Sequence, residues 1–148
     1  MPARKPGFRD ALLALELYDL RREAELRKAR DLVGELIVVS FDELRPMLDY
    51  EHPKNAHLRQ VVGYWELAAS MVARGLLHPD LYLDACDEGL FTFAVFEKHL
   101  HRIREVRPGF LTKTESIIAE HTRLKSRLLE VRARIFRSQG EREDDAGG

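Results

Sequence analysis

One periodicity dominates this sequence. Apolar residues recur every three or four positions along most of the chain, and no stretch alternates with the two-residue period of a half-buried strand. The clearest helical face lies in residues 58–72 and consists of Leu58, Val61, Val62, Trp65, Ala68, Ala69 and Val72. The sequence therefore predicts an all-α fold, a compact bundle of five to seven helices with a long C-terminal helix.

Capping and turn residues divide the pattern into segments. Ser40 and Glu43 have the spacing of a capping box, which predicts the start of a short helix. Gly75 predicts a left-handed stop for the helix that contains residues 58–72. Residues 36–39 fit a short strand as well as a helical turn, but no second β-rich segment offers such a strand a partner.

The second half of the chain reads as two further long helical stretches. Residues 90–106 are apolar nearly all round at their start, which predicts one helix surrounded by others. Pro108-Gly109 breaks the chain before the final stretch, residues 110–138, in which His121 and Thr122 mark a candidate kink. The pattern leaves open whether this stretch is one helix or two.

Length and composition predict one domain in a reducing compartment. At 148 residues a single core is expected, with residues 1–140 as the helical domain and residues 141–148 as an acidic, disordered tail. The lone Cys86 cannot form an intrachain disulfide. Asp10 and Glu16 interrupt the apolar stretch that a signal peptide would need, and no run reaches the roughly 20 residues of a membrane span. We expect a cytoplasmic protein.

Motifs of catalysis and cofactor binding are not found. The sequence contains no P-loop, dinucleotide fingerprint, nucleophile elbow or paired-cysteine spacing. The candidate metal-binding groups are His52 with His57, His99 with His101, and Asp80, Asp84 and Asp87 with Glu88. None has the spacing of a helical zinc or di-iron site, although the three aspartates permit a weak divalent-ion site. We expect no metal and no cofactor.

Tyr64-Trp65-Glu66 is the most distinctive tripeptide. Trp65 belongs to the apolar face of its helix, and Glu66 points about 100° away. A functional interpretation makes these three residues a candidate pocket, with Tyr64 or Glu66 as the polar lip of an aromatic-walled cavity. The simpler interpretation is a core tryptophan whose indole nitrogen finds a local acceptor.

Three segments carry a resemblance: residues 17–23 (LYDLRRE), 26–30 (LRKAR) and 64–70 (YWELAAS). With these segments the chain resembles a family of small bacterial all-helical proteins of unknown function, from about residue 11 to residue 136. The resemblance implies a bacterial, intracellular helical domain. It carries no assigned reaction and transfers no catalytic residue.

Charge is unevenly distributed along the chain. The formal net charge is −1, but residues 102–140 carry ten basic and four acidic side chains, and residues 141–148 carry four acidic and one basic. In the final helical stretch an apolar seam repeats at spacings of four and three: Ile117, His121, Leu124, Leu128, Val131 and Ile135. The cations Arg123, Arg127 and Arg134 follow one border of the seam, and Lys125 and Arg132 the other.

Three interpretations fit this basic-bordered helix. It packs onto its own chain, with the cations meeting carboxylates such as Glu23, Glu25, Asp31 and Glu35. It forms an antiparallel homo-oligomer or binds an acidic protein partner. It binds nucleic acid or an anionic surface, which the missing aromatics and the acidic tail disfavour. The sequence thus favours a protein-interaction or structural module, with an enzyme pocket near Tyr64 and Glu66 as a further alternative.

Overall fold

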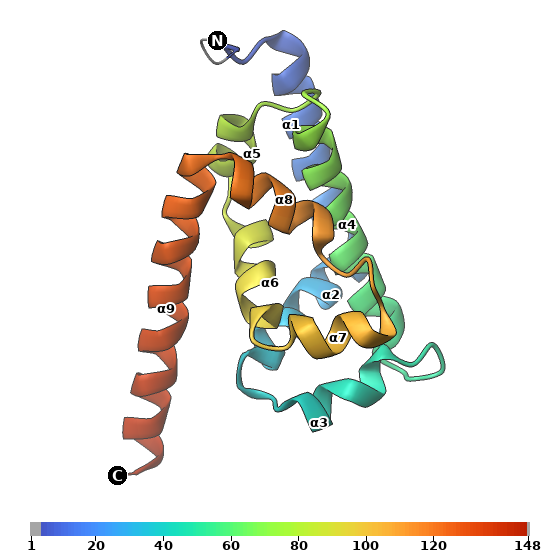
Figure 1. The fold of residues 1–148 in the computed structure, drawn as a ribbon, viewed down its shortest axis with the longest axis vertical. Coiled ribbons are helices and arrows are strands. Elements are labelled where there is room, and N and C mark those ends of the chain that lie inside the picture. Colours follow the sequence, from blue (N-terminus) through green and yellow to red (C-terminus); the bar gives the residue numbers. More distant parts are fainter. Residues whose placement is uncertain (1–3, 148) are drawn as a thin grey trace.

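The computed structural model describes residues 4–147, and this part of the chain contains α-helices and short 3-10 turns but no strand (Figure 1). The all-α prediction is confirmed. The helices are α1 (Phe8–Arg21), α2 (Ala24–Glu35), α3 (Phe41–Leu44), α4 (Asn55–Ala73), α5 (Pro79–Ala85), α6 (Glu88–Glu97), α7 (Leu100–Val106), α8 (Thr112–Glu120) and α9 (Thr122–Ala146). The 3-10 turns are η1 (Leu36–Val38) and η2 (Arg45–Leu48). Nine α-helices in the described residues exceed the five to seven expected.

Two breaks account for the larger number. The stretch expected as one helix over residues 90–106 divides at Lys98 and His99, whose side chains turn back to the segment around η1. The Lys98 ammonium donates to the Ile37 carbonyl at 3.0 Å, and the His99 ring nitrogen lies 3.2 Å from the Val39 carbonyl. At His121 the backbone is extended (φ −120°, ψ 112°), so the candidate kink is a full break between α8 and α9. Residues 36–38 form a 3-10 turn rather than a strand.

Local helix signals agree with the structure at several ends. The Ser40 hydroxyl accepts a hydrogen bond from the Glu43 amide at 3.2 Å, while the Glu43 carboxylate accepts from that hydroxyl instead of the Ser40 amide. Gly75 has φ +73°, which only glycine adopts without strain, and it follows the last turn of α4. Pro79 lies at the first position of α5, where its missing N–H costs nothing.

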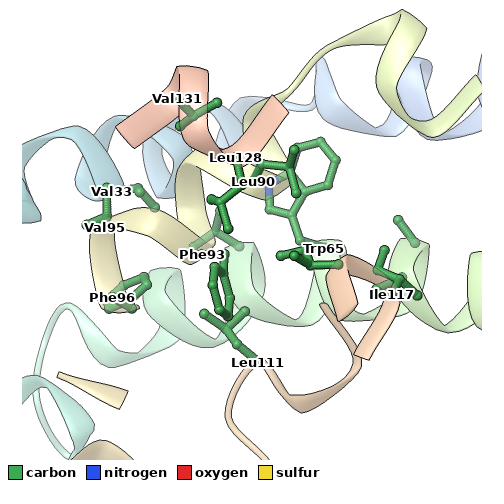
Figure 2. Close-up of a cluster of buried hydrophobic side chains, with 14 of the residues drawn as sticks. Val33, Trp65, Leu90, Phe93, Val95, Phe96, Leu111, Ile117, Leu128 and Val131 are labelled. Atoms are coloured by element: carbon green, nitrogen blue, oxygen red, sulfur yellow. The ribbon is translucent and has the colours of Figure 1, made fainter. Parts of the chain in front are cut away.

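The core surrounds α4 and α6. Helix α4 packs between α2 and α8, and α6 packs against α9. Figure 2 shows side chains from these helices converging, including Trp65 of α4, Leu90 and Phe93 of α6, and Ile117 of α8. Helix α6 buries residues on nearly every side, as its apolar sequence predicts.

Helix α9 runs along one side of the body (Figure 1). In the structure it continues through residues 141–146 and ends at Ala146, so residues 141–146 of the expected acidic tail are helical. The division of the chain at residue 140 into a domain and a tail stays a prediction.

Candidate functional site

The inner face of α9 packs on the body of the same chain. Leu124, Leu128 and Val131 are buried, and Ile135 is half-buried against the same core. Figure 2 places Leu128 beside Leu90 of α6. The apolar seam that the sequence predicts is therefore covered by α6 and its neighbours, and it is not available to another molecule.

Four of the five candidate interaction cations form ion pairs within the chain. Arg123 lies 2.8 Å from an Asp80 carboxylate oxygen and 3.0 Å from one of Asp84, and these two partners raise the pKa of its guanidinium. Arg134 lies 2.7 Å from Asp87, and Arg127 lies 3.7 Å from the same carboxylate. On the other border, the Nε of Arg132 donates to Glu97 at 2.9 Å.

The expected partners of these cations were wrong. The carboxylates that meet α9 come from α5, from α6 and from Asp87 between them, because α9 packs on α5, α6 and α8 rather than on α2. The carboxylates that the sequence suggested as partners have other contacts. Glu23 caps α2 by accepting the Leu26 amide at 2.9 Å. Glu25 lies 2.9 Å from both Lys28 and His57, and Glu35 lies 3.7 Å from Lys54.

The outer face of α9 carries an exposed apolar stripe. Leu129 is 62% exposed and Phe136 is 79% exposed, and the exposed Ala133 lies between them at helical spacing. The fifth candidate cation, Lys125, lies one turn before Leu129, is exposed, and takes part in no ion pair within residues 4–147. Sequence reasoning missed this stripe because the stronger seam on the inner face dominates the pattern.

The residues of the candidate pocket face different parts of the structure. Trp65 is buried, with its ring edge-on to Tyr64 at 4.8 Å between centroids, and the Tyr64 hydroxyl donates to the Leu17 carbonyl. Tyr64 and Trp65 line a cavity of about 20 Å³, which is room for a single water molecule. Burial raises the pKa of Tyr64 to about 12, so its phenol stays protonated at neutral pH.

Glu66 faces α8 instead of that cavity. Its carboxylate accepts the backbone amides of Lys113 at 3.0 Å and Thr114 at 2.9 Å, and the Thr114 hydroxyl at 2.7 Å. These are the unpaired donors of the first turn of α8, so Glu66 caps this helix from 47 positions earlier in the chain. A carboxylate with three donors in place holds two helices together.

The small cavity also contains the only cysteine in the sequence. The Arg21 guanidinium donates to the Cys86 sulfur, but burial raises the pKa of the thiol, which keeps it protonated. The Tyr82 hydroxyl is buried nearby, and a Cβ at Gly89 would overlap it. Gly89 therefore allows Tyr82 to pack against α6.

The candidate metal-binding histidines have different partners in the structure, whereas Asp80 and Asp84 both contact Arg123. His99 faces the Val39 carbonyl, whereas His101 is almost fully exposed, with 96% of its side chain accessible. His52 accepts the Lys54 amide at 3.1 Å. Among residues 4–147 no three or more His, Cys, Asp or Glu side chains are grouped so that they could hold a metal ion.

A buried acidic residue that sequence reasoning missed ties α1 to α5. Asp10 is 3% exposed and accepts hydrogen bonds from the Arg4 guanidinium at 2.7 Å, the Gly7 amide at 2.7 Å and the His78 amide at 2.8 Å. Arg4 and these two amides hold the pKa of the Asp10 carboxyl well below its usual range. One local feature of the sequence could have indicated this role. Gly7 lies three residues before Asp10 at the start of α1, where the carboxylate can cap the helix.

Together these features define a small helical domain built around α4, with a C-terminal helix that covers one side. Residues 6–121 match the family described as a domain of unknown function, DUF4760, and the chain belongs to this family. The matched region contains α1 to α8 and ends at the break before α9. No curated protein and no solved structure matches the chain. No helix in the described residues is both long and apolar enough to cross a membrane.

Proposed function

We propose that this chain is an intracellular protein-interaction module that pairs with a second copy of itself through the outer face of α9. The exposed stripe of Leu129, Ala133 and Phe136 carries the proposal. Single exposed apolar residues are common on protein surfaces, but two large ones on the same face of one helix favour a contact with another helix. Ala133 between them allows a close approach of two backbones.

The order of charges along α9 supports an antiparallel pair. Residues 122–137 contain six basic side chains and one acidic one, whereas residues 141–145 contain four acidic side chains and one basic one. A parallel pair would bring like charges together, and an antiparallel pair brings each basic segment beside the acidic end of its neighbour.

The spacing fits such a pair centred on Ala133. Leu129 lies four positions before this centre and Phe136 three positions after it, on the same side of the stripe. Lys125 lies eight positions before Ala133 and Glu143 lies ten positions after it, and both are on the same side of the helix as Leu129 and Phe136. Leu129 of one copy then lies beside Phe136 of the other, and Lys125 beside Glu143.

The alternatives from the sequence find less support. Nucleic-acid or anionic-surface binding uses many free cations at once, and Arg123, Arg127, Arg132 and Arg134 already have carboxylate partners. The antiparallel pair uses Lys125, which has no such partner in the described residues. An enzyme pocket at Tyr64 and Glu66 needs a cavity that both reach, and Glu66 is bound to α8.

The test is the mass of the protein in solution, measured by sedimentation equilibrium over a concentration series. We expect a dimer that dissociates on dilution, and Phe136→Asp should leave a monomer with unchanged helical content. The matched control is Leu67→Asp, which places the same charge at an exposed position of α4 and should leave the dimer intact. A wild-type monomer at all concentrations, or a Phe136→Asp dimer of wild-type stability, overturns the proposal.

Orientation is tested with charge reversal. Lys125→Glu should weaken the dimer, and combining it with Glu143→Lys should restore it, since the two side chains adjoin only in the antiparallel arrangement.

The nucleic-acid alternative predicts binding to a DNA duplex at low salt that falls steeply as salt is added. Such binding by the wild-type monomer would replace the present proposal.

A further inference from the structure

A groove beside α4, about one helical turn from Glu66, has no part in the proposed function. It lies between α4, the loop of residues 107–110 and Leu48 at the end of η2, and its volume is about 350 Å³. Pockets that hold small ligands begin at about 300 Å³. The groove shares no residue with the outer face of α9.

The floor of the groove is apolar. Leu48 and Leu58 are each only 2% exposed, and the half-buried Val62 and Phe110 complete the surface. Such a floor favours a hydrocarbon chain or ring over a polar ligand, because apolar surface gains free energy when it leaves water.

Two guanidinium groups border this floor. The Nε of Arg59 donates to the Asn55 side chain at 2.7 Å, and its guanidinium carbon lies 4.5 Å from the centre of the Tyr50 ring. An Nη of Arg107 donates to the Leu48 carbonyl at 2.8 Å. Both side chains are thus positioned, yet within residues 4–147 neither forms an ion pair. Each guanidinium has five N–H donors, so both keep donors for an anion.

Gly63 keeps the groove open at its α4 side. A glycine within a helix destabilises it relative to alanine, and a Cβ added at Gly63 would meet no atom within 4 Å. Packing against the chain therefore does not require glycine at this position. A larger side chain there would occupy the groove itself.

We infer that this groove binds a small amphipathic carboxylate, with its hydrocarbon part on Leu58, Val62 and Phe110 and its carboxylate on Arg59 and Arg107. The apolar floor matches the hydrocarbon part of such a ligand, and the two arginines at the rim match its carboxylate. Neither half alone specifies it, because a hydrocarbon without charge leaves the guanidinium groups in water and a short carboxylate leaves the floor exposed.

Decanoate is a suitable probe, titrated into the full chain by calorimetry below its micelle concentration. We expect saturable binding of one decanoate per chain, with at least about tenfold weaker binding of decan-1-ol and of acetate. Equal affinity for decanoate and decan-1-ol would remove the role of the arginines and overturn the inference.

Two variants locate the site. Gly63→Leu should remove decanoate binding while the far-ultraviolet spectrum and melting temperature stay at or above those of the wild type. Gly34→Leu is its control, since a Cβ there also meets no atom within 4 Å and Gly34 lies outside the groove. Retained binding in Gly63→Leu, or equal loss in both variants, overturns the inference.

The cationic rim is tested separately with Arg59→Gln, because the hydrogen bond from the Arg59 side chain to Asn55 stays within α4. We expect about tenfold weaker binding of decanoate and unchanged binding of decan-1-ol. An unchanged affinity for decanoate places the carboxylate elsewhere and overturns the inference. Because the groove shares no residue with the outer face of α9, none of these variants should affect the proposed dimer.

Discussion

Helices α4 and α9 are both long and amphipathic, but they are held in different ways. Helix α4 is packed by α2 and α8 and buries seven residues, and its Glu66 caps a neighbouring helix. Helix α9 is the longer of the two but buries three residues, all on one face. A helix covered on several sides organises the core, whereas a helix covered on one side retains a surface for another molecule.

The ion pairs of α9 do not compensate for its smaller buried face. Arg123, Arg132 and Arg134 are each close to half exposed, and exposed pairs typically contribute about 0–1 kcal/mol. Burying a leucine side chain contributes about 1.5–3 kcal/mol. The apolar seam therefore holds α9 on the body, and the ion pairs orient it.

The largest effect should come from the centre of α4. Trp65→Ala should lower the free energy of unfolding by about 3–5 kcal/mol, because it leaves a large cavity among side chains of α4, α5 and α6. Urea denaturation followed by circular dichroism measures this change. A loss below about 1 kcal/mol would contradict the central role of α4.

The corresponding change in α9 should act more locally. Leu128→Ala removes a side chain that is 3% exposed and should cost about 2–5 kcal/mol, with the lower part of that range expected because only one face of α9 is covered. Hydrogen exchange should accelerate more in α9 than in α4, since α9 can open separately. Equal acceleration in both helices would show that α9 is as integral to the core as α4.

Acid should act first between α1 and the start of α5, where Asp10 accepts the His78 amide. The pKa of Asp10 is lowered in the folded chain chiefly by Arg4, and the unfolded value is about 3.9. Its contribution to stability is therefore complete above about pH 4 and is lost as pH falls toward the folded pKa. Thermal unfolding across this range should show a steeper acid loss for the wild type than for Asp10→Asn, and parallel curves would contradict the assignment.

Local signals predicted much of the fold but few of the long-range contacts. The end of α4 at Gly75 and the start of α5 at Pro79 follow from the conformations of single residues. At the break between α6 and α7, Lys98 contacts the Ile37 carbonyl, 61 positions earlier, and the neighbouring sequence does not signal this contact.

In the candidate site, too, the sequence predicted local geometry but not long-range contacts. Rotation about the helix axis placed the arginines correctly on both borders of the seam, because that geometry is local to α9. Their partners depend on which helices α9 covers, so Asp80, Asp87 and Glu97 were not identified. Glu66 looked like a pocket residue because its contact with Thr114 is invisible in the pattern of its own helix.

The contact between α4 and α8 gives the next prediction. Glu66→Ala removes the acceptor for the Lys113 and Thr114 amides and should cost about 0.5–2 kcal/mol, the usual range for a lost helix cap. Glu66→Gln keeps one acceptor oxygen and should cost less. Hydrogen exchange at the two amides reports the loss directly, and unchanged protection in Glu66→Ala would show that the cap is not made in solution.

The smallest effect should come from the ion pairs that orient α9. A double-mutant cycle with Arg132→Met and Glu97→Gln should give a coupling energy of about 0.2–1 kcal/mol, and added salt should reduce it. Leu128→Ala and this cycle together separate the contribution of the apolar seam from that of the ion pairs. Leu128→Ala removes apolar contact and no charge, whereas Arg132→Met removes a charge and keeps a long side chain. A coupling energy larger than the cost of Leu128→Ala would reverse the comparison and make electrostatics the main attachment of α9.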